Sequence, residues 1–191
     1  MLMKEFLHKC WDFLKADTWQ SWTVSLLLAV ISIKFIFFPL LSLITGSPLP
    51  LVVIESCSMY HEADFPDWWE KNSEWYERKE ITKEKFDNFP FKNGLMKGDI
   101  IVVWGKSSYN IGDIIIFNAD QRYPIIHRLV SLAPLATKGD HNSDHLPDKL
   151  EEDIPSQEVI GKAVARIPFL GWVKLIFFDI LKPEQQRGFC R

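Results

Sequence analysis

The sequence predicts a mainly β protein, in which an N-terminal transmembrane helix is followed by an antiparallel, barrel-like β domain with a small helical insertion. Three observations predict this arrangement. A long apolar run lies near the N-terminus, short runs rich in valine and isoleucine follow it, and one charged, aromatic segment interrupts those runs. Short apolar runs separated by turn residues, with a single helical insert, favour antiparallel pairing over an alternating α/β sheet.

The apolar run extends from Thr23 to Leu43. A helix of that length crosses the roughly 30 Å of hydrocarbon in a bilayer, so we expect residues 22–44 to form a transmembrane helix. A cleaved signal peptide and a buried core helix are the alternatives. Signal peptides usually have a shorter apolar region and a cleavage site of small residues, whereas ITGSPLP follows here. Lys34 lies within the run and should reach towards the membrane surface, lose its proton or meet a partner's carboxylate.

The distribution of positive charge predicts how this helix is oriented. Lys4, Lys9 and Lys15 precede it, and no lysine or arginine occurs in residues 35–70. Because lysine and arginine favour the cytoplasmic side, the N-terminus should be cytoplasmic and the rest of the chain extracytoplasmic. Apolar residues recur at helical spacing in residues 1–21, which are therefore expected to form a cytoplasmic amphipathic segment.

The β domain is predicted to begin after a linker, residues 45–50, whose prolines prevent the helix from continuing. It should comprise residues 51–181 and be followed by a C-terminal tail, residues 182–191. Residues 167–181 are apolar but too short to span a bilayer comfortably, so they should pack on the domain or lie on the membrane surface. The predicted strands are Leu51–Glu55, Asp99–Trp104, Asp113–Phe117, Ile125–Leu132 and Val159–Ile167.

The helical insertion is predicted at residues 62–95, which are charged and unusually aromatic. Trp68 and Trp75 are seven residues apart and therefore fall on one side of a helix, and Thr82 could cap a second short helix. We expect a hairpin that packs on the β domain, with a lid or a membrane-interface element as the alternative.

The composition argues against several classes of function. The net charge is -3 and the lysines and arginines form no cluster, so a nucleic-acid-binding surface is not expected. Cys10, Cys57 and Cys190 lie far apart without a CxxC spacing, so neither a zinc site nor a disulfide framework is predicted. We expect no cofactor and no metal.

One set of residues could hydrolyse an amide. This chemistry needs a nucleophile, a base, a group that orients the base, and donors for the oxyanion. A histidine in a strand is usually a packing residue, and an aspartate after glycine is usually a turn former, so each residue alone is a weak signal. The candidates are Ser56, Ser58, His127 and the loop carboxylates Asp140, Asp144 and Asp148.

The order of these residues resembles that of the type I signal peptidases, in the archaeal and endoplasmic-reticulum branch that uses Ser-His-Asp where bacterial relatives use Ser-Lys. The resemblance extends from the apolar run to Lys174, apart from residues 62–95. It rests on four motifs: Ser56-Cys57-Ser58-Met59 for Ser-Gly-Ser-Met, Gly112-Asp113-Ile114-Ile115 for Gly-Asp-Ile/Val, Ile126-His127-Arg128 for Ile/Val-His-Arg, and Lys138-Gly139-Asp140-His141-Asn142 for Lys-Gly-Asp-x-Asn.

The resemblance implies that Ser58 is the nucleophile and that His127 is its general base. Asp140 or a carboxylate just after it should orient the histidine, and the Ser56 hydroxyl and the Ser58 backbone N–H should form the oxyanion hole. Relatives often carry another aspartate after Lys-Gly-Asp. Asp144 and Asp148 compete for that role here, and Asp144 is preferred.

One departure from the family motif is Cys57, which stands where relatives have glycine. A positive φ would be strained at this position, and a thiol lies beside the nucleophile. In an extended chain Cys57 faces away from Ser56 and Ser58, so we expect it to be a bystander.

Other polar residues have simpler interpretations. His61 is expected at the surface, because an extended chain puts its side chain opposite that of Ser58. His141, Asp144 and His145 could bind zinc, but no helix is predicted to hold them and the family needs no metal. Lys138 is expected to be a loop charge.

The predicted function is that of a signal peptidase, a membrane-anchored serine endopeptidase that removes signal peptides from secreted preproteins outside the cytoplasm and cuts after small residues. The alternative is a catalytically silent, membrane-anchored β module that binds preproteins or partner subunits. The expected location is the cell membrane, with a single span, or the endoplasmic-reticulum membrane in a eukaryote. Expected partners are preproteins and the lipid bilayer, with other membrane subunits or the secretion channel as further candidates.

Overall fold

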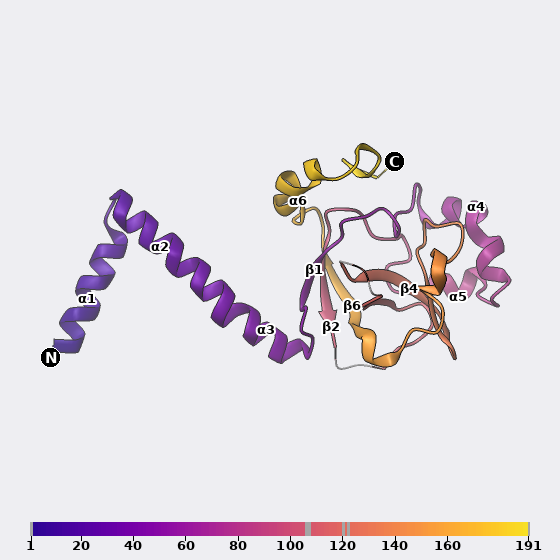
Figure 1. The fold of residues 1–191 in the computed structure, drawn as a ribbon, viewed down its shortest axis with the longest axis horizontal. Helices are drawn as coiled ribbons and strands as arrows, with labels where there is room; N and C mark the ends of the chain where they lie inside the picture. Colours follow the sequence, from indigo (N-terminus) through magenta and orange to yellow (C-terminus); the bar gives the residue numbers. More distant parts are fainter. Residues whose placement is uncertain (1, 106–107, 120, 122, 191) are drawn as a thin grey trace. The chain divides into compact units, whose positions relative to one another are not determined.

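The computed structural model describes residues 2–105, 108–119, 121 and 123–190. The chain divides into two compact units, residues 1–44 and 45–191 (Figure 1). The N-terminal unit contains α1 (Leu2–Lys15) and a second, apolar helix that begins at Trp19. The Thr18 side chain caps this second helix by accepting a hydrogen bond from the Ser21 backbone N–H at 3.3 Å.

The apolar helix consists of α2 (Trp19–Ser32), a π-helical turn (Ile33–Phe37) and α3 (Phe38–Thr45). A proline inside a helix removes one backbone hydrogen bond, and the wider turn lies just before Pro39, where the Phe38 N–H donates to the Ile33 carbonyl. Among the described residues, the 27 residues from Trp19 to Thr45 form the one helix long and apolar enough to cross a membrane. The span predicted at residues 22–44 lies within it.

The second unit is built on a six-stranded antiparallel sheet, which confirms the predicted fold class. The non-sequential order places β6 between β2 and β3, so the sheet joins the two halves of the domain. In sheet order the strands are β1 (Leu51–Val53), β2 (Ile100–Trp104), β6 (Val159–Ile167), β3 (Ile114–Phe117), β4 (Ile125–Leu132) and β5 (Leu135–Lys138).

The strand β5 was not predicted from the sequence. Its four residues contain no valine or isoleucine and one threonine, so their local strand signal is weak. They become a strand because the chain reverses after β4, which pairs Leu132 with Leu135 and Ser131 with Ala136.

Two Gly-Asp pairs begin β2 and β3 with the same turn. Gly98 and Gly112 have φ values of 92° and 96°, a conformation that favours glycine. The following aspartates close the turns, because Asp99 accepts the Met96 N–H at 3.0 Å and Asp113 accepts the Asn110 N–H at 2.9 Å. The repeated motif in the sequence thus corresponds to a repeated turn.

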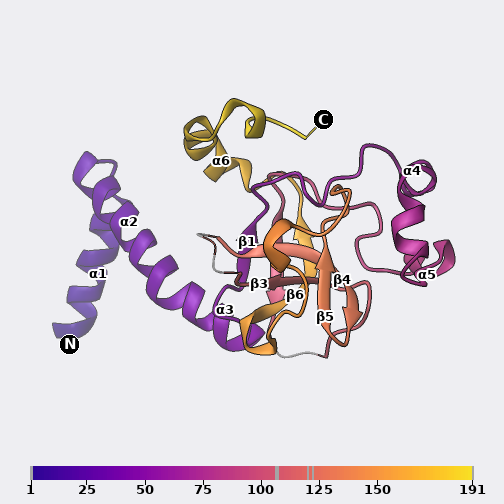
Figure 2. The same ribbon diagram turned by 45° about the vertical axis from the view of Figure 1, so that its right-hand side comes forward.

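The helical insertion forms α4 (Phe65–Glu77) and α5 (Lys83–Asp87), and Thr82 caps α5 by accepting the Lys85 N–H at 3.4 Å. Both views place these helices beside β4 (Figures 1 and 2). Their aromatic side chains form a buried cluster with Val130 of β4 and Ala136 of β5. The insertion is therefore a packed part of the domain, which favours the predicted hairpin over a lid.

The C-terminal segment follows β6 and contains α6 (Trp172–Phe178) and two short 3-10 turns, Asp179–Leu181 and Glu184–Gln186. Cys190 forms a disulfide with Cys57. The sequence signalled no disulfide framework, because the 133 residues between the two cysteines hide their proximity. Cys57, expected to take no part in the chemistry, therefore has a structural role as half of a disulfide. Two further 3-10 turns, Pro147–Lys149 and Ser156–Glu158, precede β6.

Candidate active site

The candidate nucleophile lies in a tight turn just after β1. The Tyr60 N–H donates to the Cys57 carbonyl at 3.0 Å, and the hydroxyls of Ser56 and Ser58 lie 3.1 Å apart. Cys57 is not among the described residues with positive φ, so the strain considered for this position is absent. Its side chain is held instead by the disulfide to Cys190.

His127 lies on β4, where it pairs with Ile115 of β3, and only 3% of its surface is exposed. A side chain added at Gly139 would come within 2.8 Å of both His127 Nε2 and the Ser58 carbonyl oxygen. The same position would be 2.7 Å from Asn142 Nδ2, a buried donor without a hydrogen-bond partner in the described structure. Ser58 and His127 are thus neighbours across Gly139, where the missing side chain leaves space between them.

The other ring nitrogen of His127, Nδ1, contacts the Oε1 atom of Glu151. Glu151 is completely buried, and its side chain also accepts hydrogen bonds from the Leu146 N–H at 2.6 Å and from the Thr137 hydroxyl at 3.2 Å. Glu151 was not among the candidate residues predicted from the sequence. It stands in the run LEEDIP, where nothing local distinguishes it from the exposed Glu152 and Asp153.

Asp140 takes a different place from the one expected. Its carboxylate is completely buried and forms an ion pair with Arg128 Nη2 at 2.7 Å, while Tyr76 donates a hydrogen bond at 2.9 Å and His61 Nε2 lies 3.0 Å away. Burial alone raises the pKa of Asp140, but Arg128 and the hydrogen bond from His61 hold that pKa well below its usual range. The expectation that Asp140 orients His127 therefore differs from the structure.

In the described structure, neither Asp144 nor Asp148 has a hydrogen bond or an ion pair with His127. Asp144 is exposed and accepts hydrogen bonds from Trp75 Nε1 and the His145 N–H, both at 2.8 Å. Asp148 is also exposed and has a positive φ of 61°. The hydrogen bonds observed for Asp140 and Asp144 thus go to groups other than the histidine that they were expected to orient.

Two residues assigned to the surface or to a loop are in fact buried. His61 is 6% exposed and stacks on Trp68 with ring centroids 3.8 Å apart, because the turn at Ser58 redirects the chain that was assumed to be extended. Lys138 is 2% exposed, donates to the Gly139 carbonyl at 3.0 Å and lies over the ring of Trp75. Burial lowers the pKa of Lys138 to about 8.

The predicted zinc alternative involves His141, Asp144 and His145. Within the described part of the chain, no three histidine, cysteine, aspartate or glutamate residues gather as metal ligands would. His145 Nδ1 instead lies 2.7 Å from the Thr137 carbonyl.

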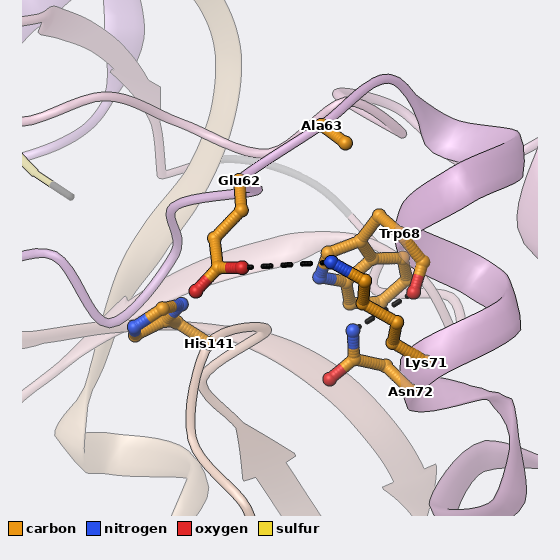
Figure 3. Close-up of a pocket in the computed structure, with 6 residues that line it drawn as sticks. All are labelled: Glu62, Ala63, Trp68, Lys71, Asn72 and His141. Atoms are coloured by element: carbon orange, nitrogen blue, oxygen red, sulfur yellow. Dashed lines mark hydrogen bonds and ion pairs between the residues drawn. The ribbon is translucent and has the colours of Figure 1, made fainter.

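A pocket of about 240 Å³ lies between the insertion and the loop that follows β5. Figure 3 shows that Lys71 faces Glu62 across the pocket, with the charged atoms 3.9 Å apart. The His141 side chain lines the pocket, and its backbone N–H donates to the Ser58 carbonyl at 2.8 Å. The pocket therefore adjoins the turn that carries Ser58.

Comparison with known proteins gives a consistent result. No protein-family model matches the chain. It is 27% identical to the protein named signal peptidase complex catalytic subunit SEC11 from Verticillium alfalfae, 28% identical to that from Fusarium vanettenii and 26% identical to that from Chaetomium globosum. Each alignment covers 163 residues, 78% of this chain and 76% of the relative. These similarities confirm the resemblance indicated by the four motifs, and by sequence the chain is a relative of the type I signal peptidases of the endoplasmic-reticulum branch.

Proposed function

We propose that this protein is a membrane-anchored serine endopeptidase that removes signal peptides from preproteins outside the cytoplasm and cuts after small residues. The observation that carries the proposal is the arrangement around Ser58. Its hydroxyl lies 3.1 Å from that of Ser56, and its carbonyl adjoins His127 Nε2 across Gly139. The similarity to proteins named as catalytic subunits of the signal peptidase complex supports the same reaction.

In the proposed mechanism, the Ser58 hydroxyl attacks the scissile carbonyl while His127 Nε2 accepts its proton. The protonated imidazole then gives that proton to the leaving amine, and a water molecule activated by the same nitrogen hydrolyses the acyl-enzyme. The Ser56 hydroxyl and the Ser58 backbone N–H donate hydrogen bonds to the oxyanion. The 3.1 Å between the two hydroxyls supports this role for Ser56.

The anchor suits this substrate class. A preprotein held in the same membrane by its own apolar segment meets an anchored enzyme at a high effective concentration, so strong intrinsic binding is unnecessary. The apolar helix Trp19–Thr45 supplies the anchor, and five residues separate its end from Leu51 of β1.

The proposed orientation places α1 in the cytoplasm and the β domain outside it. Lys4, Lys9 and Lys15 support a cytoplasmic N-terminus. The disulfide between Cys57 and Cys190 supports an oxidising compartment for the β domain. Since the relatives are named as subunits of a complex, we also propose that other membrane subunits assemble with this chain.

The test is cleavage of a preprotein with small residues before the cut site by the detergent-solubilised full chain. Ser58→Ala is expected to abolish cleavage, whereas Cys10→Ser, which changes a free and exposed cysteine, should retain wild-type activity. Ser56→Ala should lower kcat by about 100-fold, because one oxyanion donor is removed.

A Ser58→Ala variant that cuts as fast as the wild type would disprove the nucleophile assignment. If the folded wild type binds preproteins and never cuts them, the silent binding module becomes the better description.

A further inference from the structure

The carboxylate beside His127 is held in place from several sides. Glu151 Oε2 accepts the Leu146 N–H at 2.6 Å, and Oε1 accepts the Thr137 hydroxyl at 3.2 Å while contacting His127 Nδ1. Both oxygens of this completely buried side chain therefore have donors. A buried carboxylate with this arrangement has a fixed position, which a group that orients a catalytic base needs.

The backbone fixes the position of Glu151 as well. The Thr137 N–H donates to the Glu151 carbonyl at 3.0 Å, and the Ile154 N–H donates to the Leu135 carbonyl at 2.8 Å. Residues 151–154 are thus tied to β5, which pairs with β4, the strand that carries His127. Ile154 is buried in the same cluster as Leu129 of β4. The position of the carboxylate relative to the imidazole is therefore set by the sheet rather than by a mobile loop.

The loop aspartates are occupied by other donors. Asp140 is bonded to Arg128, Tyr76 and His61, and the exposed Asp144 is bonded to Trp75. Moving Asp140 to His127 would leave the completely buried Arg128 guanidinium without its carboxylate, which is a costly change.

We propose that Glu151, rather than an aspartate of the Lys-Gly-Asp loop, is the positioning residue that orients His127 for catalysis. A carboxylate at Nδ1 accepts a hydrogen bond from Nδ1–H, so the neutral ring keeps its lone pair on Nε2, the nitrogen that adjoins the Ser58 carbonyl across Gly139. The same carboxylate stabilises the imidazolium that forms when Ser58 gives up its proton. This inference rests on the proposed peptidase function.

The first experiment compares preprotein cleavage by Glu151→Gln, Glu151→Asp and the matched control Glu152→Gln, in which the adjacent exposed glutamate is changed. Glu151→Gln should lower kcat by about 10³–10⁴-fold with little change in KM, because an amide can donate to Nδ1 and favour the wrong tautomer. The kcat of Glu151→Asp should be about tenfold or more above that of Glu151→Gln, because the carboxylate is retained. Glu152→Gln should match the wild type.

A pH profile separates positioning from a merely structural role. Removing the negative charge beside the imidazole disfavours its protonated form, so the acidic limb of the kcat/KM profile should move to lower pH in Glu151→Gln. The limb should stay in place in Glu152→Gln, which removes an exposed charge. Folded Glu151→Gln and Glu151→Asp variants with activity within about threefold of the wild type, or a limb that does not move, would overturn the inference.

A second measurement uses the wild-type chain, so it does not depend on folding of a variant or on activity. The nitrogen chemical shifts of the neutral His127 ring, assigned by comparison with His127→Ala, should report a proton on Nδ1. A proton on Nε2 would overturn the role of Glu151 even if the enzyme is active. If Nδ1 carries the proton but the protein cuts no preprotein, the contact between Glu151 and His127 is supported and the proposed peptidase function is contradicted.

Discussion

At the scale of single residues, Asp140 and Arg128 form a buried unit that connects several parts of the domain. The Arg128 guanidinium donates to Asp140 and also to the carbonyls of Pro90, Phe91 and Gly112 at 2.9–3.0 Å. It thereby joins the end of the insertion and the turn before β3 to the Lys-Gly-Asp loop. Asp140 and Arg128 therefore hold these segments together beside the candidate site.

Asp140→Asn should lower the free energy of unfolding by about 3–5 kcal/mol at neutral pH, because it leaves the buried guanidinium without its counterion. Denaturant unfolding of the full chain in detergent measures this loss. Asp148→Asn, an exposed aspartate of the same loop, should change stability by less than about 0.5 kcal/mol. Equal stability of Asp140→Asn and Asp148→Asn would contradict a stabilising role for the buried ion pair.

The same ion pair predicts a dependence on pH. The pKa of Asp140 in the folded chain lies below its unfolded value of about 3.9, so its contribution is fully present above about pH 4 and is lost as the pH falls further. The stability difference between the wild type and Asp140→Asn should therefore shrink in acid. If this stability difference stays constant from pH 7 to pH 3, the ion pair of Asp140 with Arg128 does not cause the loss of stability in Asp140→Asn.

At the scale of elements, the C-terminal segment is attached to the turn that carries the nucleophile. The disulfide joins Cys190 to Cys57, and the buried pair of Lys97 and Asp179, 2.7 Å apart, holds the segment next to the start of β2. Lys182 adds an ion pair with Glu55 at 3.1 Å. These contacts connect the chain end with the residues just before Ser56.

Cys190→Ser should lower the free energy of unfolding by about 2–4 kcal/mol, because the unfolded chain loses a cross-link that closes a long loop. It should also lower cleavage activity, because Cys57 lies between the two serines. Thermal unfolding and preprotein cleavage, each with and without a thiol reductant, measure these effects. The reductant should bring the wild type to the level of Cys190→Ser and leave that variant unchanged, whereas Cys10→Ser should respond as the wild type does. A wild type insensitive to reductant would contradict this role.

At the scale of the whole molecule, the chain combines a membrane span with a β domain that holds the site. The apolar helix leaves large side chains such as Leu26, Phe35 and Leu43 more than half exposed, as a helix surrounded by lipid requires. The β domain buries its own core instead, in clusters centred on β2, β3 and β4. The apolar helix thus has no core of its own, whereas the β domain does.

The proposed orientation predicts which cysteines react from each side of the membrane. In sealed vesicles with the cytoplasmic face outward, Cys10 should react with a membrane-impermeant maleimide. A cysteine introduced by Ser156→Cys in the Cys10→Ser background should react only after detergent is added, because Ser156 is exposed on the β domain. The reverse pattern would invert the orientation.

Much of the architecture could be predicted from local patterns. The five predicted strands and both helices of the insertion carry their own signals, such as dense valine and isoleucine or the cap at Thr82. The strand β5 could not be predicted, because its residues gain their conformation from pairing with β4. In the candidate site, motif order nominated Ser56, Ser58 and His127, whereas no motif nominated Glu151.

The sequence by itself determined the membrane span and the antiparallel β class, and it nominated Ser58 and His127 as the candidate pair, because apolar length, turn residues and each motif are local patterns of a few residues. Only the tertiary structure decided which carboxylate meets the histidine and which cysteines are joined. His127 and Glu151 are 24 residues apart in the chain, and Cys57 and Cys190 are 133 apart. The pairing of β4 with β5 and the return of the C-terminal segment bring these groups together, and no local pattern encodes either one.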